Sequence, residues 1–263
     1  MSPRRICVIG NSHLAAVKLG WEAVETGETE AVFLSATGPR LRDLAVVDGV
    51  LTAPEPVATL MRELTGVSAV AVAEVDAFVL VGLRFSVNRA VQVFTTHRTW
   101  AANDPAAGGG AHLVSAGCFS GAVRNLLETS MALILAARIR SASRAPLFII
   151  PQPAASERVL QMTTAETAVW RDIVRHRRTS ELNETYLASC AAVERARDVR
   201  VLQQPRTTIV NDMFTMSTFD SPPFDQSGKP VRGGTIDPFH TNGAYGALVV
   251  AELLAQLPAT AVT

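Results

Sequence analysis

The chain has 263 residues, of which 48% are hydrophobic and 18% charged, so it can bury a sizeable core and is expected to form a single domain over residues 1–263. Equal numbers of basic and acidic residues exclude a global attraction to nucleic acid or to an anionic membrane. Three scattered cysteines without a Cys-x-x-Cys spacing argue against a disulfide framework or a zinc site. No segment is typical of a signal peptide or a membrane span, so we expect a soluble, cytoplasmic protein.

Short apolar runs alternate with segments of helical period along the chain. Runs rich in Val, Ile, Leu and Phe predict four buried strands and a weaker fifth, at 4–10, 30–36, 76–82, 145–152 and 198–205. Helices are expected at about 12–26, 55–65, 118–142, 162–196 and 242–257, with a break in the fourth near Thr179. Continuous apolar strands separated by helices predict an α/β fold whose parallel sheet is covered on both faces.

Two long connections follow the third and fifth expected strands, at about 83–117 and 204–237. In an open parallel sheet, ligands bind outside the carboxyl ends of the strands, where both connections begin. Long irregular connections in compact domains are usually functional covers or disordered segments. We therefore expect both to cover a site, with the Gly- and Pro-rich stretches 103–112 and 218–234 as its lids.

The first strand ends in the turn Gly10-Asn11-Ser12, immediately before a helix. Taken alone, Ser12 is explained by helix capping. A serine becomes an effective nucleophile only beside a general base. The turn is therefore informative only if the chain supplies a base elsewhere.

The segment "DPFHTNGAYG" near the C-terminus supplies such a base. Asp237 and His240 lie three residues apart just before the last expected helix. At this spacing the carboxylate can accept a hydrogen bond from the imidazole Nδ1–H, which leaves Nε2 free to take a proton from a serine. Pro238 restricts the backbone and helps to hold the pair.

With these two motifs at its two ends, the chain resembles the SGNH (GDSL-type) hydrolases. The resemblance spans the chain and implies a three-layer α/β/α flavodoxin-like sandwich with a central, mostly parallel sheet of about five strands. It also implies ester or acyl-transfer chemistry without a metal or an organic cofactor. On this reading Ser12 is the nucleophile, His240 the general base and then acid, and Asp237 the residue that orients the imidazole.

The family builds its oxyanion hole from the serine N–H, a glycine N–H after the second strand and an asparagine side chain after the third. Ser12 and Gly38 match the first two donors. Gly82 matches the glycine that precedes the third donor, but Arg84 stands where the family has asparagine. The resemblance is incomplete at this position, and loss of one donor typically costs about 10²–10³ in rate.

Several residues are alternatives for the third donor. Asn11 lies inside the nucleophile turn, Asn88 follows the expected position by a few residues, and Gly82 has a backbone N–H. Arg84 is a candidate to bind a developing negative charge or a substrate carboxylate, or else it is an ordinary surface or ion-paired arginine.

The remaining histidines and Cys118 are interpreted as structural. His13 follows Ser12 directly and is expected to point away from it. His97, His112 and His176 are dispersed and lack partners at ligand spacing, so no metal site is predicted. Cys118 is interpreted as a small buried residue at a helix start.

The sequence thus favours a serine esterase that cleaves an acyl ester of a small molecule or a glycan through an acyl-serine intermediate. An acyltransferase with an alcohol or sugar acceptor is the alternative within acyl chemistry, because water and alcohol acceptors use the same residues. A binding protein on the same fold is the rival from another class, and Arg84 is its best support. A phosphate site at the Ser12 turn ranks last because the chain lacks the Gly-rich spacings of nucleotide-binding loops.

Overall fold

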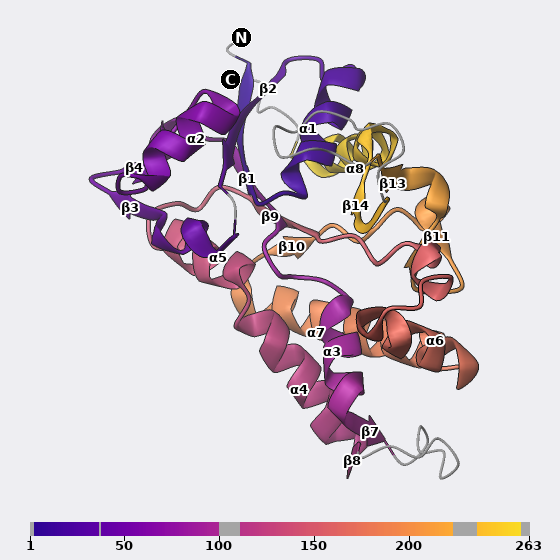
Figure 1. Ribbon diagram of the computed structural model, residues 1–263. Helices are drawn as coiled ribbons and strands as arrows, with labels where there is room; N and C mark the ends of the chain where they lie inside the picture. The colour runs from indigo at the N-terminus through magenta and orange to yellow at the C-terminus, as the bar shows by residue number, and fades with distance from the viewer. Residues whose placement is uncertain (1–2, 37, 100–110, 223–235, 259–263) are drawn as a thin grey trace.

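The computed structural model describes residues 3–36, 38–99, 111–222 and 236–258. Its centre is a five-stranded sheet in the order β2-β1-β6-β9-β10, in which every pair of neighbours is parallel (Figure 1). The strands are β1 (Arg4–Gly10), β2 (Thr29–Ser35), β6 (Ala77–Gly82), β9 (Leu147–Pro151) and β10 (Arg200–Val201). In chain order this is the 2-1-3-4-5 arrangement of flavodoxin-like folds. The predicted fold class is confirmed.

Helices cover both faces of the sheet and complete a three-layer sandwich. α1 (Leu14–Ala23) and α8 (Gly243–Gln256) lie together on one side, and α2 (Val57–Thr65) and α5 (Met131–Arg140) lie on the other (Figure 1). Alternate residues of each strand enter different cores, as expected for a sheet buried on both faces. Ile6 and Val8 of β1 pack with α1 and α8, whereas Cys7 and Ile9 belong to the larger core on the opposite face.

The helices α1 and α8 touch backbone to backbone through two glycines. A Cβ added to Gly246 would lie 1.8 Å from the carbonyl oxygen of Ala16, and one added to Gly20 would lie 2.1 Å from the carbonyl carbon of Gly246. No side chain fits between the two helices at this crossing. Because α1 begins two residues after Ser12 and α8 begins three residues after His240, the crossing helps to set the distance between these two residues.

The two long helices of the sequence prediction are each divided. The segment 118–142 forms α4 (Ala116–Glu128) and α5, and the Ser130 hydroxyl caps α5 by accepting a hydrogen bond from the N–H of Leu133. The segment 162–196 forms α6 (Ala168–Arg175) and α7 (Thr179–Arg197), with a left-handed Arg177 between them. The predicted break near Thr179 is therefore close to the observed one.

The connection 83–117 is more regular than we expected. It begins with α3 (Asn88–Thr96) and includes two short parallel strands, β7 (His97–Thr99) and β8 (His112–Val114). These strands lie at the far end of α3 and α4, away from the central sheet (Figure 1). The expectation of an irregular connection over this whole range is wrong, because α3 and two short strands lie within it.

The connection 204–237 also contains secondary structure. It forms the hairpin β11 (Ile209–Val210) and β12 (Phe214–Thr215), followed by β13 (Asp220–Ser221), which pairs with β14 (Asp237–Thr241). Most of the two expected lids, 103–110 and 223–234, lies outside the described residues.

Two further features complete the fold. An antiparallel sheet that the sequence analysis did not predict comprises β3 (Ala45–Val47), β4 (Val50–Thr52) and β5 (Ala69–Ala71). Across the ranges that the structure describes, no helix is both long enough and apolar enough to cross a membrane.

Candidate active site

The structure brings together three side chains from opposite ends of the chain. Ser12 lies in the turn between β1 and α1, and Asp237 and His240 lie on β14. The Ser12 Oγ is 2.8 Å from His240 Nε2, and His240 Nδ1 is 2.7 Å from Asp237 Oδ2. With a hydrogen on Nδ1 directed to the carboxylate, Nε2 is the acceptor for the serine hydroxyl. The three groups therefore form one continuous hydrogen-bonded chain.

Local hydrogen bonds hold both halves of this arrangement. The Asn11 and Ser12 carbonyls accept hydrogen bonds from the N–H groups of Leu14 and Ala15, which starts α1 directly behind the serine. On the other side, the N–H of Phe239 donates to Asp237 Oδ1 over 2.8 Å, which leaves Oδ2 for His240.

The loop that carries the histidine is fastened at two further points. The N–H of Ser156 donates to the carbonyl of Pro238 over 2.7 Å. Asn242 caps α8 by accepting from the N–H of Tyr245, and its side-chain amide donates to the carbonyls of Thr218 and Asp220. The segment from Asp237 to Asn242 is thus tied to the loop after β9, to the segment around β13 and to α8.

The Asp237 carboxylate is charged at neutral pH. Its hydrogen bond with His240 lowers its pKa, and the hydrogen bond from the Phe239 N–H lowers it further against an opposing effect of burial. The side chains of Asp237 and His240 are 47% and 33% exposed, so the pair opens to solvent. A carboxylate held in this way favours the Nδ1–H tautomer of the imidazole and stabilises an imidazolium when one forms.

His13 lies against the imidazole of His240, which the sequence analysis did not foresee. The two rings stack with centroids 4.5 Å apart and planes inclined by 15°. His13 is only 8% exposed, and burial, followed by repulsion from His240, lowers its pKa to about 3. The expectation that His13 points away from the site is therefore wrong. The only sequence signal for this contact was that His13 directly follows Ser12, immediately before α1.

Gly82 fits closely against the nucleophile turn. Its φ is +72°, and an added Cβ would lie 2.6 Å from Asn11 Oδ1 and 3.0 Å from His13 Cδ2. The Asn11 Oδ1 also accepts a hydrogen bond of 3.3 Å from the N–H of His13. Both the left-handed backbone and the lack of space therefore require glycine at this position.

Gly38 begins a short 3₁₀-helix, η1 (Gly38–Asp43), just after β2. This places it at the carboxyl edge of the sheet, one strand away from the Ser12 turn. Its position in the chain order agrees with the expected backbone donor.

Arg84 and Asn88 lie further along the loop that follows β6. Leu83 and Arg84 continue the left-handed backbone of Gly82, with φ values of +50° and +63°. Arg84 is exposed, its carbonyl accepts from the guanidinium of Arg89, and no hydrogen bond within the described ranges joins it to Ser12. Asn88 begins α3, and its Oδ1 is buried without a partner among the described residues.

Two interpretations of the remaining residues need correction. His97 and His112 are not dispersed, because they are opposite each other on β7 and β8 with ring centroids 5.6 Å apart. Cys118 is exposed rather than buried, because it lies in the first turn of α4, where its N–H donates to the capping Ser115. Among the described residues, no group of three or more His, Cys, Asp or Glu side chains could hold a metal ion.

No protein-family model matches the chain, and no curated protein matches it. Several solved structures do. An extracellular lipase from Streptomyces rimosus matches with 14% identity and a TM-score of 0.44, covering 97% of this chain and 100% of the lipase. A lipase/acylhydrolase from Enterococcus faecalis matches with 13% identity and a TM-score of 0.41, covering 98% of each chain.

The periplasmic domain of a lipopolysaccharide acetyltransferase from Salmonella ser. Paratyphi A matches with 11% identity and a TM-score of 0.44, covering 95% of this chain and 82% of that one. At TM-scores below 0.5 these likenesses carry no weight for the chemistry of the site. The fold is established by the strand order, and the site is characterised by its own geometry.

Proposed function

We propose that the chain is a serine hydrolase that cleaves a carboxylic ester through an acyl-serine intermediate. Ser12 is the nucleophile, His240 the general base and then acid, and Asp237 the residue that orients His240. The observation that supports the proposal is the unbroken hydrogen-bonded chain from the serine hydroxyl through the imidazole to the carboxylate. A capping serine requires no such partners, whereas a nucleophile does.

The first half of the reaction forms the acyl-serine. The Ser12 Oγ attacks the ester carbonyl carbon while His240 Nε2 takes the hydroxyl proton. The carbonyl oxygen becomes an oxyanion, and the imidazolium is stabilised by Asp237. As the oxyanion collapses, the bond to the alcohol oxygen breaks and His240 returns the proton to that oxygen. The alcohol leaves and the acyl group remains on Ser12.

The second half releases the acid. A water molecule attacks the acyl carbon while His240 takes one of its protons. Collapse of the second oxyanion breaks the bond to the Ser12 Oγ, which receives the proton from His240. The products are a carboxylic acid and the free enzyme. An alcohol or sugar hydroxyl in place of water would make the same residues an acyltransferase.

The N–H groups of Ser12 and Gly38 are the proposed oxyanion donors, with the side-chain amide of Asn11 as the third. The Asn11 Oδ1 is used by the N–H of His13, which leaves the amide nitrogen as the free end of the side chain. Asn11 belongs to the Ser12 turn, whereas Asn88 belongs to α3, so Asn11 is the better substitute for the family's asparagine. The N–H of Gly82 is the remaining alternative.

Arg84 is the proposed contact for a negatively charged group of the substrate. It is exposed and forms no ion pair with a described residue. Arg84→Ala is expected to raise KM for an ester that carries a free carboxylate and to leave KM for a neutral ester unchanged. Equal KM changes for both esters would contradict this role.

The substrate class that we propose is the ester of a small molecule or a glycan, and the proposed steps use only the chain's own residues. A reducing compartment such as the cytoplasm is the proposed location. Cys7, Cys118 and Cys190 are all free thiols, which agrees with such a compartment.

Hydrolysis of p-nitrophenyl esters from acetate to octanoate tests the proposal. We expect turnover by the wild type and loss of about 10⁵–10⁶ in kcat in Ser12→Ala, because the serine, base and orienting carboxylate act as a unit. Ser120→Ala, at an exposed position on α4, is the matched control and should retain full activity. Comparable rates for Ser12→Ala and the wild type would refute the nucleophile, and an added alcohol acceptor would distinguish transfer from hydrolysis.

A further inference from the structure

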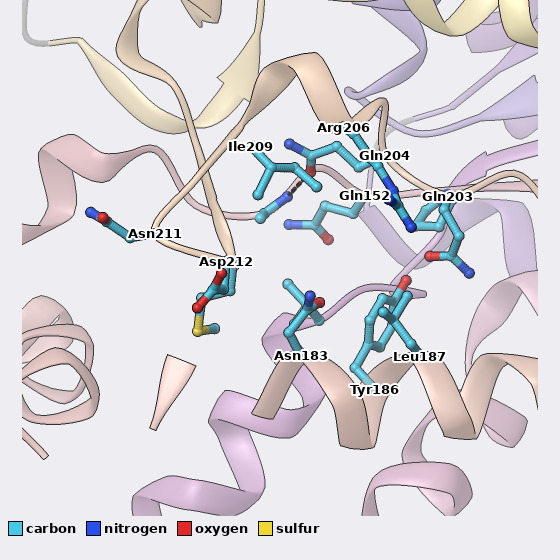
Figure 2. Close-up of a pocket in the computed structure, with 14 residues that line it drawn as sticks. Gln152, Asn183, Tyr186, Leu187, Gln203, Gln204, Arg206, Ile209, Asn211 and Asp212 are labelled. Carbon is cyan, nitrogen blue, oxygen red and sulfur yellow. Dashed lines mark hydrogen bonds between the residues drawn. The ribbon is translucent and has the colours of Figure 1, made fainter. Parts of the chain in front are cut away.

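A cavity of about 570 Å³ lies near the carboxyl ends of β9 and β10, apart from the three residues of the candidate site. The N-terminal half of α7 forms one wall, and the turn between β11 and β12 forms another (Figure 2). Its polar lining residues include Gln152, Asn183, Tyr186, Gln203, Arg206 and Asp212. The volume is within the range of small-molecule sites, roughly 300–1,000 Å³.

The hydroxyl of Tyr186 is the first sign that the cavity receives a ligand. Tyr186 is 5% exposed, and its hydroxyl finds no oxygen or nitrogen partner among the described residues. The neighbouring polar group is the thiol of Cys190, which is a weak acceptor. A buried hydroxyl without a good partner is destabilising, so a retained one calls for a partner from outside the chain.

Two side-chain amides of the cavity are also unengaged. Gln152 and Asn183 use no side-chain atom in the hydrogen bonds of the described residues. Figure 2 shows the polar ends of Asn183 and Tyr186 on α7 directed toward Gln152 and Gln203 on the opposite wall. The polar groups thus converge on a common space.

Gln204 shows what a structural amide looks like in the same cavity. Its Oε1 accepts from the N–H of Ala154 over 2.9 Å, and its Nε2 donates to the hydroxyls of Thr208 and Thr215 over 3.1 Å each. The protein thus engages the oxygen and both N–H groups of this amide. Gln204 therefore stabilises the fold, whereas the side-chain amides of Gln152 and Asn183 are left to bind a ligand.

The charges of the cavity balance. Arg206 contributes one positive charge and Asp212 one negative charge, and both are exposed. Asp212 Oδ2 also accepts a hydrogen bond from the Ser180 hydroxyl. A ligand with a net charge would gain from one of these residues and lose to the other, so the lining favours a neutral, polar molecule.

We infer that this cavity binds a neutral saccharide through its hydroxyl groups. A side-chain amide offers a donor and an acceptor side by side, which matches two neighbouring hydroxyls on a sugar ring. The Tyr186 hydroxyl can donate to a third. The apolar lining from Leu187, Ile209 and Met213 suits the C–H faces of the same ring.

The cavity lies beside the candidate site but does not depend on it. Ala154 lines the cavity, and two residues later the N–H of Ser156 donates to the carbonyl of Pro238, next to Asp237. The short segment after β9 thus separates the two. Saccharide binding can therefore be measured without ester cleavage, and the two proposals can fail independently.

Titration calorimetry with cellobiose, maltose and N,N′-diacetylchitobiose tests the inference on the full chain. We expect at least one of these neutral disaccharides to bind to the wild type and equally to Ser12→Ala. Asn183→Ala should weaken its binding about tenfold, as expected for one lost hydrogen bond of roughly 1.4 kcal/mol. Asn125→Ala, at an exposed position on α4, is the matched control and should bind as the wild type does.

Tyr186→Phe separates a ligand contact from a structural hydroxyl. Because the hydroxyl lacks a good partner in the fold, its removal should leave the midpoint of thermal unfolding unchanged or higher while weakening disaccharide binding. Tyr245→Phe changes the chain's other tyrosine, which lies in α8 and outside the cavity lining, and should leave the binding unchanged. The inference is overturned if none of the three sugars binds, or if Asn183→Ala and Tyr186→Phe bind as tightly as the two control variants.

Discussion

The imidazole rings of His13 and His240 lie face to face, with their centroids 4.5 Å apart. Burial holds the pKa of His13 near 3, so His13 is neutral throughout the physiological range. The proposed base therefore stacks against an uncharged ring that fixes one of its faces, while Asp237 fixes its Nδ1 edge. Two contacts of different kinds restrict the orientation of the same side chain.

His13 should make the fold sensitive to acid. Its pKa is lower in the folded state, about 3, than the value of about 6.5 in an unfolded chain, so only the unfolded state takes up the proton between these values. Stability from this group is complete above pH 6.5 and is lost as the pH falls below it. The contribution lost between pH 7 and pH 5 is on the order of 2 kcal/mol. Urea unfolding of wild type and His13→Leu at both pH values should show a smaller loss in the variant. Equal losses would contradict the burial of a neutral His13.

The glycine contact between α1 and α8 predicts a pair of opposite effects. Gly246→Ala places a methyl group where the Ala16 carbonyl lies and should destabilise the fold by about 1–3 kcal/mol or more. It should also lower kcat, because a shift of about 1 Å between Ser12 and His240 can cost 10²-fold. Gly121→Ala, on α4 with no atom within 4 Å of the added Cβ, should instead stabilise by about 0.5–1 kcal/mol. Denaturant unfolding and ester kinetics measure both. Equal effects of the two changes would show that the contact does not position the site.

Asp237→Asn should reduce turnover without preventing substrate binding. The amide cannot stabilise an imidazolium as the carboxylate does, so kcat should fall by about 10²–10⁴ with little change in KM. Asp172→Asn removes a carboxylate from the exposed ion pair with Arg175 on α6 and is the matched control. It should keep wild-type kinetics, since such surface pairs contribute little. Wild-type kcat in Asp237→Asn would exclude an orienting role for Asp237.

The sequence predicted the central sheet, and it predicted that Ser12, Asp237 and His240 lie together, for identifiable physical reasons. Apolar runs such as residues 77–82 are buried on both faces, so their composition marks them as parallel strands. The Ser12 turn and the Asp237-to-His240 spacing are local patterns that carry their own chemistry. Their approach in space follows from the close packing of α1, which comes after Ser12, against α8, which comes after His240.

Other features depend on contacts that no local pattern records. The stacking of His13 on His240 joins residues that are distant in the chain, and the pairing of His97 with His112 depends on the short strands β7 and β8. The helix α3 is only nine residues long and follows three left-handed residues from Gly82 to Arg84, so the sequence pattern did not reveal where it begins.

Labelling with a fluorophosphonate, followed by intact-mass measurement and peptide mapping, tests the central claim most directly, because the reagent reacts with an activated serine and not with ordinary ones. The account predicts a single adduct per chain, located on Ser12. It also predicts that Ser12→Ala shows no adduct, that His240→Ala is labelled far more slowly, and that Ser120→Ala is labelled as fast as the wild type. An unlabelled wild type, or an adduct on a serine other than Ser12, would contradict the proposed nucleophile.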